Sequence, residues 1–319
     1  MKAIVIKEFG GPEVVQVEEV PDPRAGDGAL LIDVEQSGLN FSDLHQMAGS
    51  YLKKNDLPFV PGTEVFGTDP SGRRVLGIIS SGGHAERAVV PAGSAIPVPD
   101  FVTGQEALAL GIQGFTAWHL LRTCARTVRG QSVVVHAAAG GVGSIAVQLA
   151  KAWGASRVIA VASTPDKREL ALSLGADAVA DSHAADMTAA LLEANRGRPV
   201  DVVLEMAGGR TLDQGLAALG THGRMVVYGT ASDEPSTPVR LESLIGASRS
   251  VIGFWAADLM RTTPRALSDT LTGLFGMVKN KQLKPVNGGS YPLDQAAHAF
   301  SLFAGRSTTG KAVLRMTEN

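Results

Sequence analysis

The chain has 319 residues, of which 45% are hydrophobic and 19% are charged, a balance typical of a soluble globular protein. Its formal net charge of −2 argues against a surface that binds nucleic acid or an anionic membrane. No apolar run approaches the ~20 residues that a membrane-spanning helix needs. The N-terminus lacks the long apolar region of a signal peptide, so we expect a cytoplasmic protein. With Cys124 as the single cysteine, no internal disulfide and no multi-cysteine zinc site can form.

The first part of the chain, up to about residue 115, consists of short strand-like runs separated by glycine and proline turns. The expected strands are Ala3–Lys7, Val14–Glu18, Ala29–Gln36, Val75–Ile79 and Glu86–Val90. Strands that follow one another without helices between them predict a β-rich, partly barrel-like domain. A helical stretch over Gly104–Leu121 then leads into a region of different character.

A glycine-rich turn joins an apolar β-branched run at Ser132–Val135 to a helical pattern that begins near Ile145. Strand, tight turn and helix N-terminus together are typical of a site for a dinucleotide pyrophosphate, because free N–H groups of the helix face the anion. The residues expected to contact the cofactor here are Ala139, Gly140, Gly141, Val142 and Gly143. Ala138 replaces the first glycine of the usual pattern, which is allowed if that residue needs no positive φ. The alternative is an ordinary tight turn without a ligand.

The next strand, Arg157–Ala162, ends at hydroxyl side chains, where an NAD site places a carboxylate on the ribose. Ser163 and Thr164 stand at this point and Lys167 follows, together with Arg168. Hydroxyls and cations suit a 2′-phosphate, so we predict NADPH as the cofactor in preference to NADH. In the alternative interpretation, Ser163 and Thr164 cap the next helix and the cations lie in solvent.

Strands and helices continue to alternate, which predicts a doubly wound parallel sheet with helices on both faces. The further strands are expected at Ala178–Ala180, Val200–Glu205 and Gly223–Gly229. Ligands in such sheets bind beyond the carboxyl ends of the strands, which places Gly208 and Gly229 near the ribose and nicotinamide. Simple turn chemistry accounts for these glycines equally well.

The alternating pattern ends after Val251–Phe254, and helices are expected over Pro264–Lys281 and Asp294–Phe303. A closing strand, Lys311–Leu314, is expected to rejoin the first domain. We therefore predict an α/β protein of three segments: a β-rich domain at residues 1–116, a Rossmann-type domain at 117–255, and a C-terminal part at 256–319 that completes the first domain.

Several short motifs resemble, in their order, the medium-chain dehydrogenase/reductase superfamily, and in particular its zinc-independent, quinone oxidoreductase-like (zeta-crystallin-like) branch. The resemblance covers essentially the whole chain. Its markers are Ser37–Asp43, Pro61–Glu64, Gly82–Glu86, the Ala137–Gly143 turn, Leu174–Asp177 and Arg306–Lys311. It implies that the first domain is a GroES-like catalytic domain and that the protein is a homodimer.

The resemblance implies hydride transfer from NADPH to a small quinone or to an α,β-unsaturated carbonyl compound. Zinc-dependent relatives have a thiolate and an imidazole where this chain has Asn40 and Thr63, so no metal is expected. Asn40 and Tyr51 are the candidate catalytic residues. Asn40 would donate a hydrogen bond to the cofactor or to a carbonyl oxygen, and Tyr51 would donate a proton or a hydrogen bond to an enolate. Phe254 and Lys311 complete the expected cofactor site, as an apolar wall and a phosphate partner.

Each of these assignments has an alternative. Asn40 fits an Asx turn, Tyr51 a loop anchor, Phe254 core packing and Lys311 a solvent-facing position. At the level of the protein, the first alternative is a 2-enoyl thioester reductase. The second is a nucleotide-binding protein without turnover, acting as a structural or redox-responsive partner.

Overall fold

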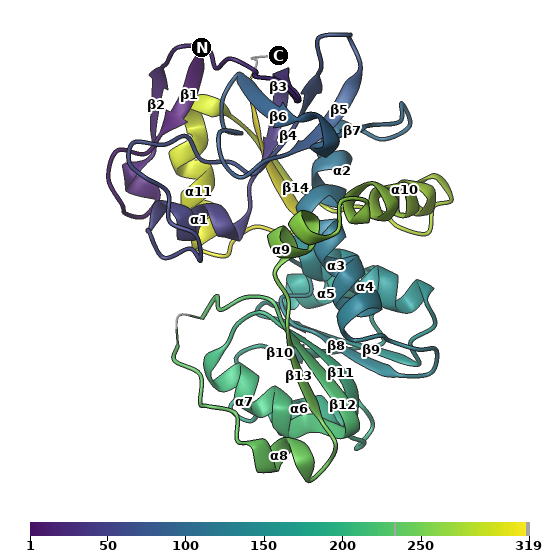
Figure 1. Ribbon diagram of the computed structural model, residues 1–319. Helices are drawn as coiled ribbons and strands as arrows, with labels where there is room; N and C mark the ends of the chain where they lie inside the picture. The colour runs from purple at the N-terminus through teal and green to yellow at the C-terminus, as the bar shows by residue number, and fades with distance from the viewer. Residues whose placement is uncertain (233, 317–319) are drawn as a thin grey trace. The chain divides into compact units, whose positions relative to one another are not determined.

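Each of the two units into which the chain divides is built around its own sheet (Figure 1). The β-rich unit takes Met1–Gln113, Pro264–Lys279 and the chain from Pro285 onward. The parallel-sheet unit takes Gly114–Thr263 and the short segment Asn280–Lys284. These limits come from a computed structural model that describes residues 1–232 and 234–316. The first change of unit falls three residues before the expected boundary, and the second falls after α9 rather than before it.

Six parallel strands form the sheet of the parallel-sheet unit, in the order β10-β9-β8-β11-β12-β13. They are β8 (Ser132–Val135), β9 (Arg157–Ala162), β10 (Ala178–Asp181), β11 (Val200–Glu205), β12 (Leu219–Val227) and β13 (Ser250–Gly253). The chain runs outward from β8 in one direction and from β11 in the other, so the order reverses between these two neighbours. The residues of β8 and β11 are almost all buried, as expected for strands covered on both faces.

Helices connect these strands and cover the two faces of the sheet (Figure 1). They are α4 (Gly141–Ala152), α5 (Pro165–Ser173), α6 (Met187–Ala194), α7 (Gly209–Ala218) and α8 (Leu241–Ile245), and α9 (Ala256–Thr262) follows the last strand. Leu191 of α6 and Leu212 of α7 are buried in one cluster with Val134, Val203 and Met225 of the sheet. This cluster follows directly from the apolar spacing of the two helices.

The sheet of the β-rich unit is mostly antiparallel and follows the path β14-β15-β3-β4-β5-β7, with β6 paired to β3. Its strands are β3 (Ala29–Gly38), β4 (Glu64–Thr68), β5 (Arg74–Ile78), β6 (Arg87–Pro91), β7 (Ala95–Pro97), β14 (Asn287–Pro292) and β15 (Lys311–Arg315). A separate pair joins β1 (Lys2–Val5) to β2 (Gln16–Glu19). Because β15 lies between β3 and β14, the C-terminal segment completes the N-terminal sheet, as we expected for Lys311–Leu314.

The helices of the β-rich unit are α1 (Phe41–Met47), α2 (Gly104–Leu108), α10 (Ala266–Lys279) and α11 (Ala296–Ala304), with short 3₁₀ turns at Pro12–Val14, Ala92–Ser94 and Leu293–Gln295. After α2 the chain remains helical through a π-type turn at Ala109–Gly114, then through α3 (Phe115–His119) and a second π-type turn at Leu120–Cys124. The first of these turns is kinked at Gly111, whose ψ of -108° is not helical. Among the described helices, none is long and apolar enough to cross a membrane.

Candidate functional site

The glycine-rich turn between β8 and α4 is folded tightly against itself. Gly140 donates its N–H to the carbonyl oxygen of Ala137 at 2.8 Å, and Ala137 has a φ of 49°. A Cβ on Gly143 would lie 2.2 Å from that same carbonyl oxygen, so position 143 admits no side chain without a shift of the backbone. The positive φ falls on Ala137 and not on Ala138, which explains why alanine is tolerated at Ala138.

The N-terminus of α4 presents backbone N–H groups at this turn. Gly140 is the N-cap, and no side chain within the described part of the chain caps the helix. The first intrahelical bond runs from the N–H of Ser144 to the carbonyl of Gly140, which leaves the first-turn amides of Gly141, Val142 and Gly143 without an intrahelical acceptor. A helix N-terminus with free amides and a close backbone approach fits the pyrophosphate of a dinucleotide.

The end of β9 carries the expected hydroxyl and basic side chains, and the structure separates their roles. Thr164 caps α5, because its Oγ1 accepts the N–H of Lys167 at 3.3 Å. The Arg168 guanidinium donates to the carbonyl of Ala162 at 3.1 Å and pairs with Asp181 at 3.1 Å. Arg168 is therefore engaged within the sheet edge, whereas Ser163 is half-buried beside the strand end.

Three polar side chains lie side by side where β8, β11 and β12 end. Glu205 is fully buried, and its Oε1 accepts the N–H groups of Ala207 at 2.6 Å and Gly208 at 2.9 Å. The Nε2 atom of buried His136 lies 3.5 Å from Oε2 of Glu205. Tyr228 follows β12, and its N–H donates to the carbonyl of Glu205 at 3.0 Å. The carboxylate thus shapes the turn that enters α7.

Burial dominates the ionisation of the two neighbours of Glu205. It lowers the pKa of His136, although the charge of Glu205 acts in the opposite direction. It raises the pKa of Tyr228, and here the charge of Glu205 adds to the effect. His136 is consequently a neutral imidazole and Tyr228 a neutral phenol at neutral pH.

Neutral burial of His136 predicts a pH dependence of stability. In the unfolded chain, His136 takes up a proton below its ordinary pKa of 6.5, whereas in the folded chain it stays neutral to lower pH. The free energy of unfolding is therefore highest above pH 6.5 and decreases as the pH falls through this value. The slope reaches at most about 1.4 kcal/mol per pH unit for one proton. We expect His136→Gln to flatten this dependence, as measured by urea unfolding at several pH values between about 5 and 8. The exposed His183, replaced in the same way, serves as the control, and an equal slope in all three proteins would contradict the assignment.

Gly208 and Gly229 lie at the same end of the sheet as Glu205, just after β11 and β12. Gly208 has a φ of 80° and precedes α7, and a Cβ on Gly229 would lie 3.0 Å from the carbonyl oxygen of Met206. The turn chemistry that we considered as their alternative role is therefore present at Gly208. Neither glycine adds a side chain at this end of the sheet, where the hydroxyl of Ser236 accepts the N–H of Gly209 at 2.9 Å.

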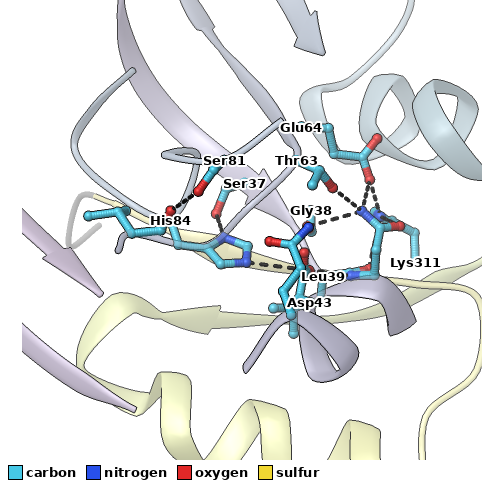
Figure 2. Close-up of polar contacts among 12 residues, drawn as sticks. Ser37, Gly38, Leu39, Asp43, Thr63, Glu64, Ser81, His84 and Lys311 are labelled. Carbon is cyan, nitrogen blue, oxygen red and sulfur yellow. Dashed lines mark hydrogen bonds and ion pairs between the residues drawn. The ribbon is translucent and has the colours of Figure 1, made fainter. Parts of the chain in front are cut away.

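A second group of buried polar side chains, drawn in Figure 2, lies in the β-rich unit around Lys311. Lys311 and Glu64 are fully buried and form an ion pair, and the Lys311 ammonium also donates to the carbonyl of Leu39 at 2.9 Å. Asn40 bridges the pair: its Nδ2 donates to Glu64 at 2.7 Å, and its Oδ1 accepts from Lys311 at 3.0 Å. The second oxygen of Glu64 accepts the N–H of Ile112 at 3.0 Å, beside the kink in the helix.

This group, which we call the Lys311 network (Asn40, Glu64 and Lys311), corrects two of our expectations. Lys311 was expected at a cofactor phosphate or in solvent, but its ammonium is buried and held by three acceptors. The amide of Asn40 is 4% exposed and uses both its ends within the network. Asn40 therefore fixes the junction of β3 and α1.

His84 anchors the other side of the same junction. Its Nδ1 lies 2.7 Å from the Ser37 hydroxyl, and its Nε2 lies 3.5 Å from Oδ2 of Asp43. The same Asp43 oxygen accepts the N–H of Asn40 at 2.8 Å. Figure 2 shows Ser37, His84 and Asp43 in one row, and since all three are fully buried, we assign them to the architecture of the unit.

Tyr51 and Phe254 lie on connecting segments and are only partly buried. The carbonyl of His45 near the end of α1 accepts the N–H groups of Ser50 at 2.9 Å and Tyr51 at 3.1 Å, so the fold of α1 sets the backbone at Tyr51. Phe254 follows β13, and its ring stacks on that of His119, with centroids 6.3 Å apart. A half-buried aromatic ring of this kind agrees with a wall of a binding site as well as with packing.

Sequence reasoning missed Glu64, His136 and Glu205 as site residues. A glutamate at the end of an apolar run, as in Val200–Glu205, is a signal of a buried carboxylate, since such a residue needs fixed partners. His136 stands between an apolar strand and the glycine turn and carries the same kind of signal. Glu64 has no such signal, because its partner Lys311 is distant in the chain.

The positions that correspond to zinc ligands carry chemistry that does not suit zinc. Thr63 Oγ1 lies 3.4 Å from the amide nitrogen of Asn40, and neither side chain offers a thiolate or an imidazole. Throughout residues 1–232 and 234–316, no three His, Cys, Asp or Glu side chains are grouped as metal ligands would be. The ammonium of Lys311 is the cation that Glu64 meets.

Known proteins resemble this chain over nearly its full length. The model of the alcohol dehydrogenase GroES-like domain matches residues 26–68, and that of the zinc-binding dehydrogenase family matches residues 141–272. Rat quinone oxidoreductase is 32% identical over 313 residues, which cover 94% of this chain and 92% of the relative.

Two solved structures have the same fold. Quinone oxidoreductase from Thermus thermophilus, studied alone and with NADPH, is 36% identical with a TM-score of 0.88 and covers 99% of this chain and 100% of its own. The Escherichia coli quinone oxidoreductase complexed with NADPH is 29% identical with a TM-score of 0.92 and the same coverage. The GroES-like segment, the parallel sheet with its glycine-rich turn and these relatives together identify the chain as a member of the medium-chain dehydrogenase/reductase superfamily, in its quinone oxidoreductase-like branch.

Proposed function

We propose that this protein is an NADPH-dependent oxidoreductase that transfers hydride to a quinone or to the β-carbon of an α,β-unsaturated carbonyl compound. The observation that carries the proposal is the uncapped N-terminus of α4 at a turn where Gly143 admits no side chain. Such a turn fits a pyrophosphate, and the similar quinone oxidoreductases of T. thermophilus and E. coli were crystallised with NADPH.

The residues that would hold the cofactor are those of the parallel-sheet unit. The amides of Gly141, Val142 and Gly143 would bind the pyrophosphate, with Ala139 and Gly140 lining the turn. Ser163, Thr164 and Lys167 stand at the end of β9, where the 2′-phosphate of NADPH is recognised in this fold. Gly208, Gly229 and Phe254 would lie along the nicotinamide half.

NADPH, when bound, supplies a hydride, and the chain supplies orientation and a proton. The proposed proton donor is the Tyr51 hydroxyl, which would stabilise the oxygen of an enolate as negative charge develops on it. We do not propose Asn40 as a catalytic residue, because its amide is hydrogen-bonded to Glu64 and Lys311. Its role is to fix the start of α1, the helix that precedes Tyr51.

Two further features of the proposal concern metal and assembly. We propose that the reaction needs no zinc. Asn40 and Thr63 are poor zinc ligands, and the carboxylate of Glu64 forms an ion pair with the ammonium of Lys311. We also propose a homodimer. β13 is an edge strand of the parallel sheet, and its partly buried Val251 and Ile252 suit pairing across a two-fold axis.

The test is NADPH oxidation by the purified, chelator-treated protein with three acceptors: an ortho-quinone, a simple enone and a short enoyl-CoA. Turnover of the quinone or the enone, faster with NADPH than with NADH, is the expected result. Turnover of the enoyl-CoA alone would move the assignment to a 2-enoyl thioester reductase. Tight NADPH binding with no turnover of any acceptor would favour the nucleotide-binding protein without catalysis.

Replacing the Tyr51 hydroxyl separates its proposed chemistry from its position. We expect Tyr51→Phe to lower kcat for the enone about tenfold, which corresponds to the loss of one hydrogen bond to developing charge, while the KM for NADPH stays unchanged. Steady-state kinetics measure both constants. Tyr291→Phe, in β14 of the same unit, is the matched control. A wild-type kcat in the Tyr51 variant would leave Tyr51 with the role of a loop anchor.

A further inference from the structure

Glu205 is a buried carboxylate at the point where the order of the parallel sheet reverses. It is the last residue of β11, and β11 is the neighbour of β8 at the reversal (Figure 1). In open α/β sheets, ligands bind beyond the carboxyl ends of the strands at this switch point. The glycine-rich turn follows the carboxyl end of the adjacent strand β8. Glu205 therefore lies at the same end of the sheet that would bind the cofactor.

The negative charge of Glu205 is held in place by the backbone. The N–H groups of Ala207 and Gly208 both donate to Oε1, an arrangement that stabilises a carboxylate anion. The carboxylate is fully buried, so water does not screen it. Its position is therefore fixed relative to the turn that enters α7.

The second carboxylate oxygen of Glu205, Oε2, accepts no hydrogen bond from the described residues. Oε2 faces Nε2 of His136 at 3.5 Å, and within the described residues neither atom has a hydrogen-bond partner. His136 is neutral, because burial lowers its pKa, so the imidazole that faces the carboxylate at 3.5 Å does not balance its charge. Tyr228, whose pKa is raised by burial and by the charge of Glu205, is a neutral phenol. Among the described residues, His136 and Tyr228 are thus neutral neighbours, and the negative charge of the Glu205 carboxylate remains at the carboxyl ends of the strands.

We propose that Glu205 sets the relative affinity of the protein for oxidised and reduced cofactor, by stabilising the positive charge of the oxidised nicotinamide. The reduced ring is neutral, and loss of a hydride with its two electrons leaves one positive charge on the ring. A buried anion therefore favours the oxidised form, and with it the donation of hydride to the acceptor. Glu205 does not touch the cofactor and is a positioning residue that acts through its charge. This inference rests on the proposed function.

The test compares the dissociation constants of NADP⁺ and NADPH, measured by titration calorimetry, in the wild-type protein and in Glu205→Gln. Glutamine keeps an oxygen that accepts the N–H groups of Ala207 and Gly208, and it removes the charge. We expect NADP⁺ binding to weaken about tenfold relative to NADPH binding. A purely structural role would weaken both nucleotides equally. Glu193→Gln, an exposed site on α6, is the control in which the ratio stays unchanged.

Glu205→Asp provides the converse variant, since it keeps the charge and shortens the side chain. We expect both affinities to fall while their ratio stays that of the wild type. An unchanged ratio in the glutamine variant overturns the inference, and a changed ratio in the aspartate variant does so even if the glutamine variant fails to fold. If the wild-type protein binds neither nucleotide, the proposed function itself is wrong, which is a different outcome from binding with an unaltered ratio.

Discussion

Alanine at position 143 is expected to weaken NADPH binding about 100-fold. The new Cβ would lie 2.2 Å from the carbonyl oxygen of Ala137 and 2.8 Å from the Cα of Ala138, both in the backbone of the turn. No flexible side chain can move to relieve this contact, so the turn itself must open. The amides of the first turn of α4 then no longer converge on one anion. Isothermal titration with NADPH measures the effect.

The neighbouring glycine offers a graded control. A Cβ on Gly140 would lie 3.2 Å from the Ala137 carbonyl oxygen, a contact that small adjustments relieve, so Gly140→Ala should weaken binding much less than Gly143→Ala. Gly276→Ala, on α10 with open space around the new Cβ, should leave binding unchanged. Equal dissociation constants for the two turn variants would show that the tightness of the turn does not determine cofactor affinity. Urea unfolding of each variant verifies that the parallel-sheet unit remains folded.

Lys311→Met is expected to lower the stability of the β-rich unit by about 3–5 kcal/mol. Methionine has similar length, but it leaves the Glu64 carboxylate fully buried without its cation. It also removes the donor to the Leu39 carbonyl and to Asn40. Hydrogen exchange of the amides in β4 and β15 reports on this unit. The fluorescence of Trp118, Trp153 and Trp255 reports on the other unit and should change far less.

A second substitution separates the unpaired charge from the lost contacts. In Lys311→Met combined with Glu64→Gln, neither member of the pair carries a charge, so the double variant should be more stable than Lys311→Met alone. Lys54→Met, at an exposed lysine of the same unit, should have little effect. If the two substitutions in the network were simply additive, Glu64 and Lys311 would not act as a pair.

The parallel-sheet unit is the part of the fold that could be predicted from sequence. Its strands and helices differ strongly in period, and turns such as Gly140–Gly143 and Gly175 separate them, so β8, α4, β9 and β11 lie within a few residues of their expected positions. The Leu174–Asp177 motif also has a local cause. Asp177 accepts the N–H of Val158 at 2.9 Å and pairs with Lys151 at 2.5 Å, which joins the end of α4 to the start of β9.

The β-rich unit was harder to predict because its contacts are distant in the chain. We expected neither β4, which begins at Glu64, nor α1, which has barely two turns. Lys311 binds Glu64 and Asn40, which precede it in the chain by 247 and 271 positions. No local sequence pattern indicates such distant pairs. For the same reason, Lys311 and Asn40 were assigned to the cofactor and the substrate instead of to each other.

The place of β15 between β3 and β14 also determines the order in which the chain can fold during synthesis. Glu64 is made early, and the ammonium that neutralises it belongs to a residue made 247 positions later. Until Lys311 leaves the ribosome, the nascent N-terminal segment can bury that carboxylate only at a large free-energy penalty. The parallel-sheet unit, in contrast, has all its strands once β13 has emerged. We therefore expect the parallel-sheet unit to fold before the β-rich unit, whose N-terminal strands obtain their last partner only when β15 has been synthesised.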